Sequence, residues 1–219
     1  MKKAFTMIEL VFVIVVIGIL AATILPSTKT NPLQEAAVQL VSHIRYTQHL
    51  AMVDDKFDMN DPNWYKKRWQ LVFSTGEFTG NGQAYTIFSD TAGGSTGNAQ
   101  ESEIARNPQN REQIMTGGYG NTAAINYNSN DFKGMKKLNI GKSYGVTSVT
   151  LSGAGAGACS NSRIVFDHLG RLIKGDISGN TSAYESDNLV RVPCDVKLKN
   201  TTESVTLRIE PETGYVSIL

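Results

Sequence analysis

Residues 1–26 of this 219-residue chain read MKKAFTMIELVFVIVVIGILAATILP. An apolar run covers residues 5–25, follows two lysines and holds a single charged residue, Glu9. As an α-helix with about 1.5 Å rise per residue, the run reaches roughly 30 Å, which is enough to cross the hydrocarbon core of a membrane once. We therefore predict a membrane helix over residues 5–25.

The lysines predict the orientation of this helix. Positive residues stay on the cytoplasmic side, so Lys2 and Lys3 hold the N-terminus there and everything after Leu25 crosses. Two simpler interpretations remain open, a secretory signal cleaved near Ala21-Ala22 and a plain anchor. Glu9 argues against both, because an ionisable group at the centre of a membrane segment costs about 2.5 to 3.5 kcal/mol and normally has a function.

A longer pattern surrounds Glu9. The residues AFTMIEL (4–10), followed by unbroken apolar sequence to Ile17, resemble the class III signal of type IV pilins and type II secretion pseudopilins. The resemblance implies that a prepilin peptidase cuts between Ala4 and Phe5, that the new Phe5 amine is methylated, and that the mature helix packs into a filament. This chain carries Ala4 where the family nearly always has glycine.

The resemblance also implies a role for Glu9, which would pair with the Phe5 amine of a neighbouring subunit. Both charges are poorly compensated when one chain lies alone in lipid, and a satisfied pair is far less costly than a lone buried charge. The implied location is the bacterial inner membrane, crossed once, with a cytoplasmic N-terminus and a periplasmic head that later joins a pilus or pseudopilus. The implied partners are other pilin or pseudopilin subunits, the prepilin peptidase and the inner-membrane assembly platform.

A second helical pattern follows Pro26, a residue that can kink or break a helix. Asn31 is a plausible cap with Pro32 at the first helical position, and we predict an amphipathic stalk helix over residues 26–53. The alternative is a separate soluble helix after a linker. One apolar stripe should face the head: Leu33, Ala37, Leu40, Ile44 and Ala51.

From residue 54 the period changes from helical to extended. We predict loops over 92–98 and 116–134 and a short helix within 101–115. The predicted fold class is therefore α+β. A long N-terminal helix, made of the membrane segment and the stalk, packs on a mostly antiparallel β-sheet head over residues 54–219. Residues 1–4 form a leader peptide. Predicted strands are 69–73, 84–88, 148–151, 163–166, 189–192, 196–198 and 205–209, with a closing hairpin to 215–218.

The C-terminal half carries a weaker resemblance. Residues 163–172 and 205–216 look like minor pseudopilins of the H type and related T-type fimbrial proteins. This implies a non-enzymatic assembly subunit, a minor pseudopilin of a type II secretion or related type IV filament system, that helps to start or cap filaments. Some T-type members bind DNA through arginines after the last hairpin glycine, but Tyr215 occupies that position here.

The alternative function is a DNA-uptake minor pilin whose head binds DNA. Trp64, Lys66, Lys67 and Arg68 mix aromatic rings with cations, as single-stranded nucleic-acid sites do. The other interpretation is that a core strand begins at Trp69 and the lysines are ordinary solvated residues. With 21 basic and 20 acidic residues the net charge is +1, so no global field attracts nucleic acid, and we do not favour this alternative.

The chain has two cysteines, Cys159 and Cys194, and in an oxidising periplasm we expect them to form a disulfide. In the chain-entropy model this bond would raise the free energy of unfolding of the head by about 4 kcal/mol. Two free buried thiols are the alternative.

The three histidines lack metal-ligand spacing, and we predict no catalytic residues, cofactor or metal. An oxygen-rich cluster over residues 54–61 could bind calcium, but without EF-hand spacing a solvated loop is favoured.

Overall fold

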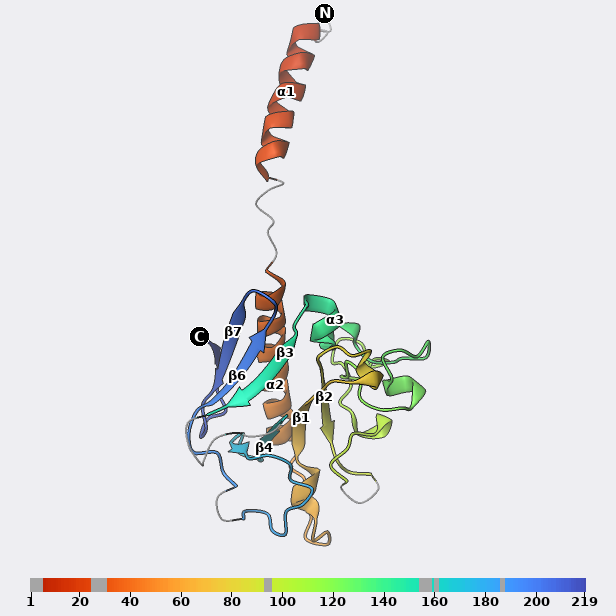
Figure 1. The fold of residues 1–219 in the computed structure, drawn as a ribbon, viewed down its shortest axis with the longest axis vertical. Helices are drawn as coiled ribbons and strands as arrows, with labels where there is room; N and C mark the ends of the chain where they lie inside the picture. Colours follow the sequence, from red (N-terminus) through yellow and green to blue (C-terminus); the bar gives the residue numbers. More distant parts are fainter. Residues whose placement is uncertain (1–5, 25–30, 93–95, 154–158, 160–161, 186–187) are drawn as a thin grey trace, which may run out of the picture. The chain divides into compact units, whose positions relative to one another are not determined.

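A computed structural model describes residues 6–24, 31–92, 96–153, 159, 162–185 and 188–219. The chain forms two compact units, Met1–Asn31 and Pro32–Leu219, and each is described by itself. Figure 1 shows one helix in the first unit and a mixed helix and sheet architecture in the second, which we call the head. The fold class is therefore α+β, as predicted.

The first unit contains helix α1, Met7–Ile24, which is 18 residues long. Large apolar side chains are exposed around it, from Met7 to Leu20. Within the described residues, no helix combines the length and the apolar character expected of a membrane span. The prediction of one long N-terminal helix is not matched, because α1 is short and the Pro26 joint lies outside the described residues.

Helix α2, Pro32–Val53, opens the head, with Pro32 at the first helical position as predicted; residues 26–30 of the predicted stalk lie outside the described residues. All five residues of the predicted apolar stripe are buried on it. The helix contacts strands of two different sheets. These strands are β1 (Trp69–Ser74) and β4 (Arg163–Phe166) of one sheet, and β6 (Cys194–Lys199), β7 (Ser204–Ile209) and β8 (Val216–Ile218) of the other. A helix with one apolar face gains most of its stability from such packing, so α2 forms the centre of the core.

Two four-stranded antiparallel sheets cover α2, with strand orders β2-β1-β4-β5 and β3-β6-β7-β8 (Figure 1). The predicted strands are confirmed to within two residues except one. The strands are β1 Trp69–Ser74, β2 Ala84–Ser89, β3 Ser148–Ser152, β4 Arg163–Phe166, β5 Leu172–Ile173, β6 Cys194–Lys199, β7 Ser204–Ile209 and β8 Val216–Ile218.

The predicted strand over 189–192 is wrong. Leu189 forms only an isolated bridge with Ile173, and Pro193 then follows without the N–H that a ladder needs. The short strand β5, which pairs with β4 instead, was not predicted. Buried Val190 explains the misleading apolar pattern, because its burial comes from packing rather than from membership of a strand.

Of residues 101–115, which we expected to hold a short helix, only Glu101–Glu103 are helical, and they form a single 3₁₀ turn. The chain instead runs along the free edge of β2, where Ile104 bridges Phe88 and Thr116 bridges Thr86. Between these bridges it doubles back, since Arg106 pairs with Ile114. The predicted loop over 116–134 is confirmed, with one 3₁₀ turn at Ala123–Ile125.

Gln48 of α2 ties two tight turns to the helix. Its Nε2 donates to the carbonyl oxygens of Gly170 (2.9 Å) and Thr213 (2.7 Å), one from each sheet. The turn after Thr213 places Gly214 at φ +62°, and a Cβ there would come within 2.3 Å of the same Gln48 nitrogen. The close approach requires glycine.

We expect Gln48→Ala to lower the free energy of unfolding by about 1 to 3 kcal/mol, because two carbonyl groups lose their donor. Urea denaturation of the full chain in detergent measures the change. His49→Ala is the matched control, since His49 is the exposed neighbour on the same helix. Equal stability of the two variants would contradict the role given to Gln48.

A buried polar cluster joins α2 to β2. Tyr85 is fully buried, and its hydroxyl accepts a hydrogen bond from Gln39 Nε2 (2.8 Å). His43 Nδ1 lies 2.7 Å from the same hydroxyl, and the two groups share a hydrogen bond. Burial lowers the pKa of His43 to about 4.

This lowered pKa predicts acid sensitivity. The ordinary histidine pKa is 6.5, so between pH 6.5 and about 4 the unfolded chain binds a proton that the folded chain does not. The free energy of unfolding is therefore highest above pH 6.5, and it falls by at most about 3 kcal/mol as the pH decreases through this window. His43→Gln should flatten the difference in unfolding free energy between pH 7 and pH 5, whereas His49→Gln should leave it unchanged. An unaltered pH difference in His43→Gln would refute the assignment.

Candidate functional site

Glu9 lies in the first turn of α1 and is the only charged residue among residues 6–24. Its Oε2 accepts hydrogen bonds from the Thr6 backbone N–H (3.2 Å) and the Thr6 hydroxyl (3.3 Å). The Glu9 backbone N–H in turn donates to Thr6 Oγ1 (3.3 Å). Thr6 and Glu9 thus form a reciprocal capping box, which the T-x-x-E spacing before the apolar run could have predicted.

The capping box has a consequence for charge. Thr6 stabilises the Glu9 carboxylate through two hydrogen bonds but supplies no opposite charge, and among residues 6–24 no cation is present. The carboxylate remains exposed on a helix that is otherwise apolar. Ala4 and Phe5, the predicted processing residues, lie outside the described residues.

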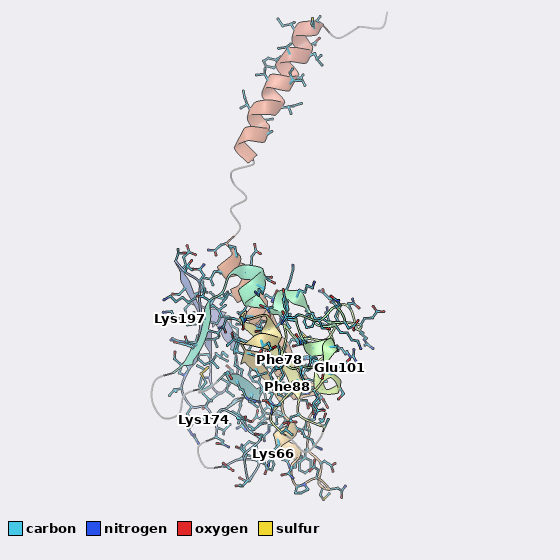
Figure 2. All side chains as sticks on the ribbon, turned by 45° about the vertical axis from the view of Figure 1, so that its right-hand side comes forward. Lys66, Phe78, Phe88, Glu101, Lys174 and Lys197 are labelled. Atoms are coloured by element: carbon cyan, nitrogen blue, oxygen red, sulfur yellow. A yellow bond between two sulfur atoms is a disulfide. The ribbon has the colours of Figure 1, made fainter. Side chains whose placement is uncertain are left out.

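The basic and aromatic segment predicted as a nucleic-acid patch forms a short 3₁₀ helix, Trp64–Lys67, before β1. Arg68 is buried, and its guanidinium lies 5.2 Å from the centre of the Trp64 ring and 4.7 Å from the centre of the Tyr184 ring. The same guanidinium donates a hydrogen bond to the Ala183 carbonyl oxygen (2.9 Å). Lys67 forms an ion pair with Asp61. Lys66 lies at the lower end of the head in Figure 2. The structure therefore does not bring Lys66, Lys67 and Arg68 together as one open cationic surface.

The acidic cluster after α2 is an ordered loop. Side chains of Asp55, Asp58 and Asp61 each accept a hydrogen bond from the backbone two residues on. Asp54 accepts from the Trp69 indole N–H (2.8 Å) and pairs with Lys56. In the part of the chain that the structure describes, no group of three or more metal-binding side chains comes together.

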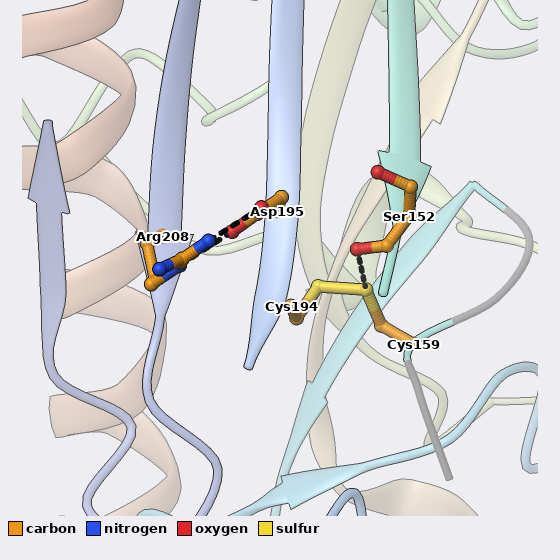
Figure 3. Close-up of a disulfide and its surroundings, with 5 residues drawn as sticks. All are labelled: Ser152, Cys159, Cys194, Asp195 and Arg208. Carbon is orange, nitrogen blue, oxygen red and sulfur yellow. Dashed lines mark hydrogen bonds and ion pairs between the residues drawn. A yellow bond between two sulfur atoms is a disulfide. The ribbon is translucent and has the colours of Figure 1, made fainter. Parts of the chain in front are cut away.

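The predicted disulfide is present. Cys159 and Cys194 are joined with their Cα atoms 5.4 Å apart, and the bond links the start of β6 to the segment between β3 and β4 (Figure 3). Beside it, Asp195 pairs through both carboxylate oxygens with Arg208 of β7, and this pair lowers the pKa of Asp195. Because β3 and β4 belong to different sheets, the disulfide fastens the connection between the two sheets to β6.

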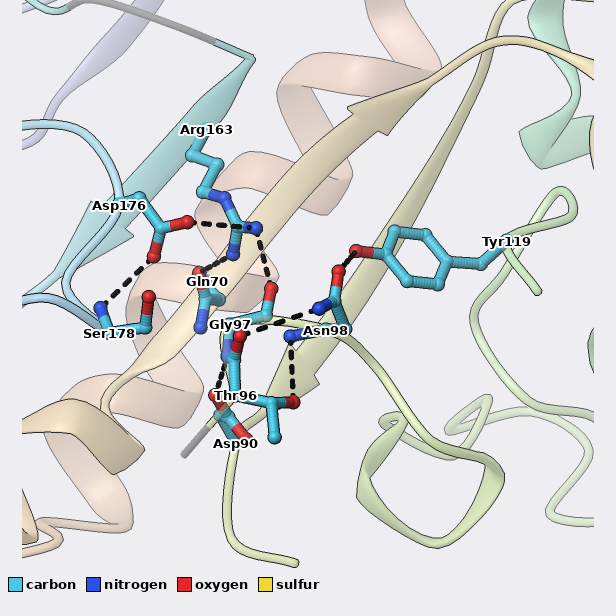
Figure 4. Close-up of polar contacts among 9 residues, drawn as sticks. All are labelled: Gln70, Asp90, Thr96, Gly97, Asn98, Tyr119, Arg163, Asp176 and Ser178. Atoms are coloured by element: carbon cyan, nitrogen blue, oxygen red, sulfur yellow. Dashed lines mark hydrogen bonds and ion pairs between the residues drawn. The ribbon is translucent and has the colours of Figure 1, made fainter. Parts of the chain in front are cut away.

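Arg163 organises a polar network around the loop after β2 (Figure 4). Its guanidinium donates to Gln70 Oε1 (2.9 Å) and to the Gly97 carbonyl, and it pairs with Asp176 (3.2 Å). The Gly97 N–H donates to the buried Asp90 carboxylate. We did not predict this network, because its members are scattered along the chain.

The network lies beside a cavity of about 860 Å³. Asn98 follows Gly97 and accepts a hydrogen bond from the Tyr119 hydroxyl (3.2 Å) across the cavity wall. Phe78 and Glu101, labelled in Figure 2, also line it. Glu101 is paired with Lys133 (2.9 Å). The cavity is a wide, open depression formed by loops, without an assembled set of catalytic groups among the described residues.

Comparison of the chain with protein-family models, with curated proteins and with solved structures finds no match.

Proposed function

We propose that this chain is a non-enzymatic assembly subunit of the type IV pilin and pseudopilin superfamily, most similar to the H-type minor pseudopilins of type II secretion. The observation that carries the proposal is the placement of Glu9. It is a single carboxylate in the first turn of an apolar helix, and its hydrogen-bond partner within the helix carries no charge.

The processing step would supply an opposite charge for this carboxylate. Cleavage after Ala4 creates a positive amine on Phe5, and that amine can neutralise Glu9 of an adjacent subunit as the helices pack. An uncompensated charge in a low-dielectric surrounding is strongly unfavourable, so pairing between subunits favours assembly over the free monomer. In this proposal α1 supplies the membrane anchor before assembly and the filament core afterwards.

Two features of the head support the proposal. Helix α2 packs on antiparallel sheets, and the disulfide suits an oxidising compartment such as the periplasm. The DNA-uptake alternative receives less support, because Arg68 is buried and Lys67 is engaged by Asp61.

Co-purification with filaments tests the proposal. Surface filaments or overexpressed pseudopili from the native host, sheared and pelleted, should contain the chain, and deletion of the prepilin peptidase should remove it from the pellet. A chain that stays wholly in the membrane fraction of both strains would contradict the proposal. A gel shift of the purified full chain with DNA separates the alternative function, for which a retarded DNA band is required.

A further inference from the structure

A smaller cavity of about 330 Å³ lies between α2, the start of β1 and the loop over residues 105–111. Tyr46, Leu50 and Trp69 give it an aromatic and apolar wall, and Arg106 and Arg111 stand at its rim. We call this site the arginine pocket. Its size suits one or two amino-acid side chains rather than a large ligand.

The side chains of both arginines are exposed to solvent. Among the described residues neither forms an ion pair, whereas Arg163, Arg171 and Arg208 each pair with a carboxylate. A guanidinium presents a rigid fork of donors that matches a carboxylate, and two such forks beside one cavity favour an anionic group there.

The loop that carries the arginines is already ordered. The Asn107 N–H donates to the Gln113 carbonyl (2.9 Å), and the Asn107 side-chain amide donates to Gln113 Oε1 (3.1 Å). The Tyr46 hydroxyl, from α2, donates to the Arg106 carbonyl at 3.4 Å. A rigid loop lowers the entropy cost of binding, so the pocket is prepared for a ligand.

We propose that the arginine pocket binds an acidic peptide segment of a partner protein, with an aromatic or aliphatic side chain against the Trp69 wall and a neighbouring carboxylate on Arg106 and Arg111. A peptide fits better than an extended nucleic acid, because the pocket is small and Arg106 and Arg111 are the only cations among the described residues that line it. Two guanidinium groups beside one small cavity match a single carboxylate next to an apolar side chain rather than a long run of phosphates. The inference goes beyond the proposed assembly function and does not depend on it.

Fluorescence anisotropy tests this inference with the full chain in detergent micelles and a dye-labelled peptide, acetyl-Gly-Asp-Phe-Glu-Leu-Gly-amide. We expect the peptide to bind about tenfold more tightly than its Asn/Gln counterpart. Arg106→Gln and Arg111→Gln should each weaken binding about tenfold, since each removes a charge-assisted hydrogen bond. Arg191→Gln is the control, because Arg191 is exposed and lies at a different cavity.

Three results would overturn the inference. They are no saturable peptide binding up to ~1 mM, equal binding of the acidic and neutral peptides, and unchanged binding in both arginine variants. A twelve-residue oligothymidylate that binds through the two arginines while the peptide does not would assign the pocket to nucleic acid instead. Unfolding temperatures equal to wild type establish that each variant is folded, and Glu9→Ala should bind the peptide normally even if assembly fails.

Discussion

Replacement of Glu9 by alanine is expected to reduce incorporation of the chain into filaments by at least about a hundredfold while membrane insertion continues. In the proposed filament, the variant leaves the Phe5 amine of the adjacent subunit without its partner, and breaking a buried ion pair from one side costs about 3 to 5 kcal/mol. Quantitative immunoblots of sheared filaments and of the membrane fraction, taken from the same cells, measure both quantities.

Two further variants separate the charge of Glu9 from its role in the capping box. Glu9→Gln keeps an oxygen that can accept from Thr6 but removes the charge, and we expect it to fail as Glu9→Ala does. Thr6→Ala removes the cap hydroxyl but keeps the charge, so we expect a loss of only about 1 kcal/mol in helix stability and near-normal incorporation. The reverse order, with Glu9→Gln active and Thr6→Ala inactive, would show that Glu9 acts only as a helix cap.

Loss of the disulfide is expected to destabilise the head by about 4 kcal/mol. The bond joins two cysteines that are 35 positions apart in the sequence, and without it the unfolded chain gains conformational freedom. The double variant Cys159→Ser/Cys194→Ser should therefore unfold at a clearly lower urea concentration than wild type.

Reduction provides the control for this prediction. Dithiothreitol should lower the stability of the wild-type chain to that of the double variant and should leave the variant itself unchanged. A wild-type chain that loses less than about 1 kcal/mol on reduction would contradict the chain-entropy argument.

Periodic burial explains which parts of the fold were predictable. The stripe from Leu33 to Ala51 and the alternating burial along β6 reflect contact with one core, and local sequence carries that signal. The wrong predictions lie where contacts with distant parts of the chain determine the backbone conformation. Val190 is buried without belonging to a strand, and the segment after Glu103 follows the edge of β2 instead of forming a helix.

The candidate sites divide in the same way. Glu9 and the cysteines stood out because each is unusual in its local sequence. The Arg163 network, the His43 and Tyr85 cluster and the arginine pocket each join residues that are far apart along the chain, so one sequence could not reveal them. Arg68 shows the opposite case, in which a residue that suggested an open patch is held inside the head by two aromatic rings.

Intact-mass measurement and N-terminal sequencing of the mature chain, purified from native membranes, test the central claim most directly. The account predicts a polypeptide that begins at Phe5, with one methyl group on its terminal amine and with the whole of α1 retained. A mature chain that begins after the apolar run, or one that still begins at Met1, has no charged Phe5 amine for Glu9 to meet. Either result would contradict the proposed assembly mechanism.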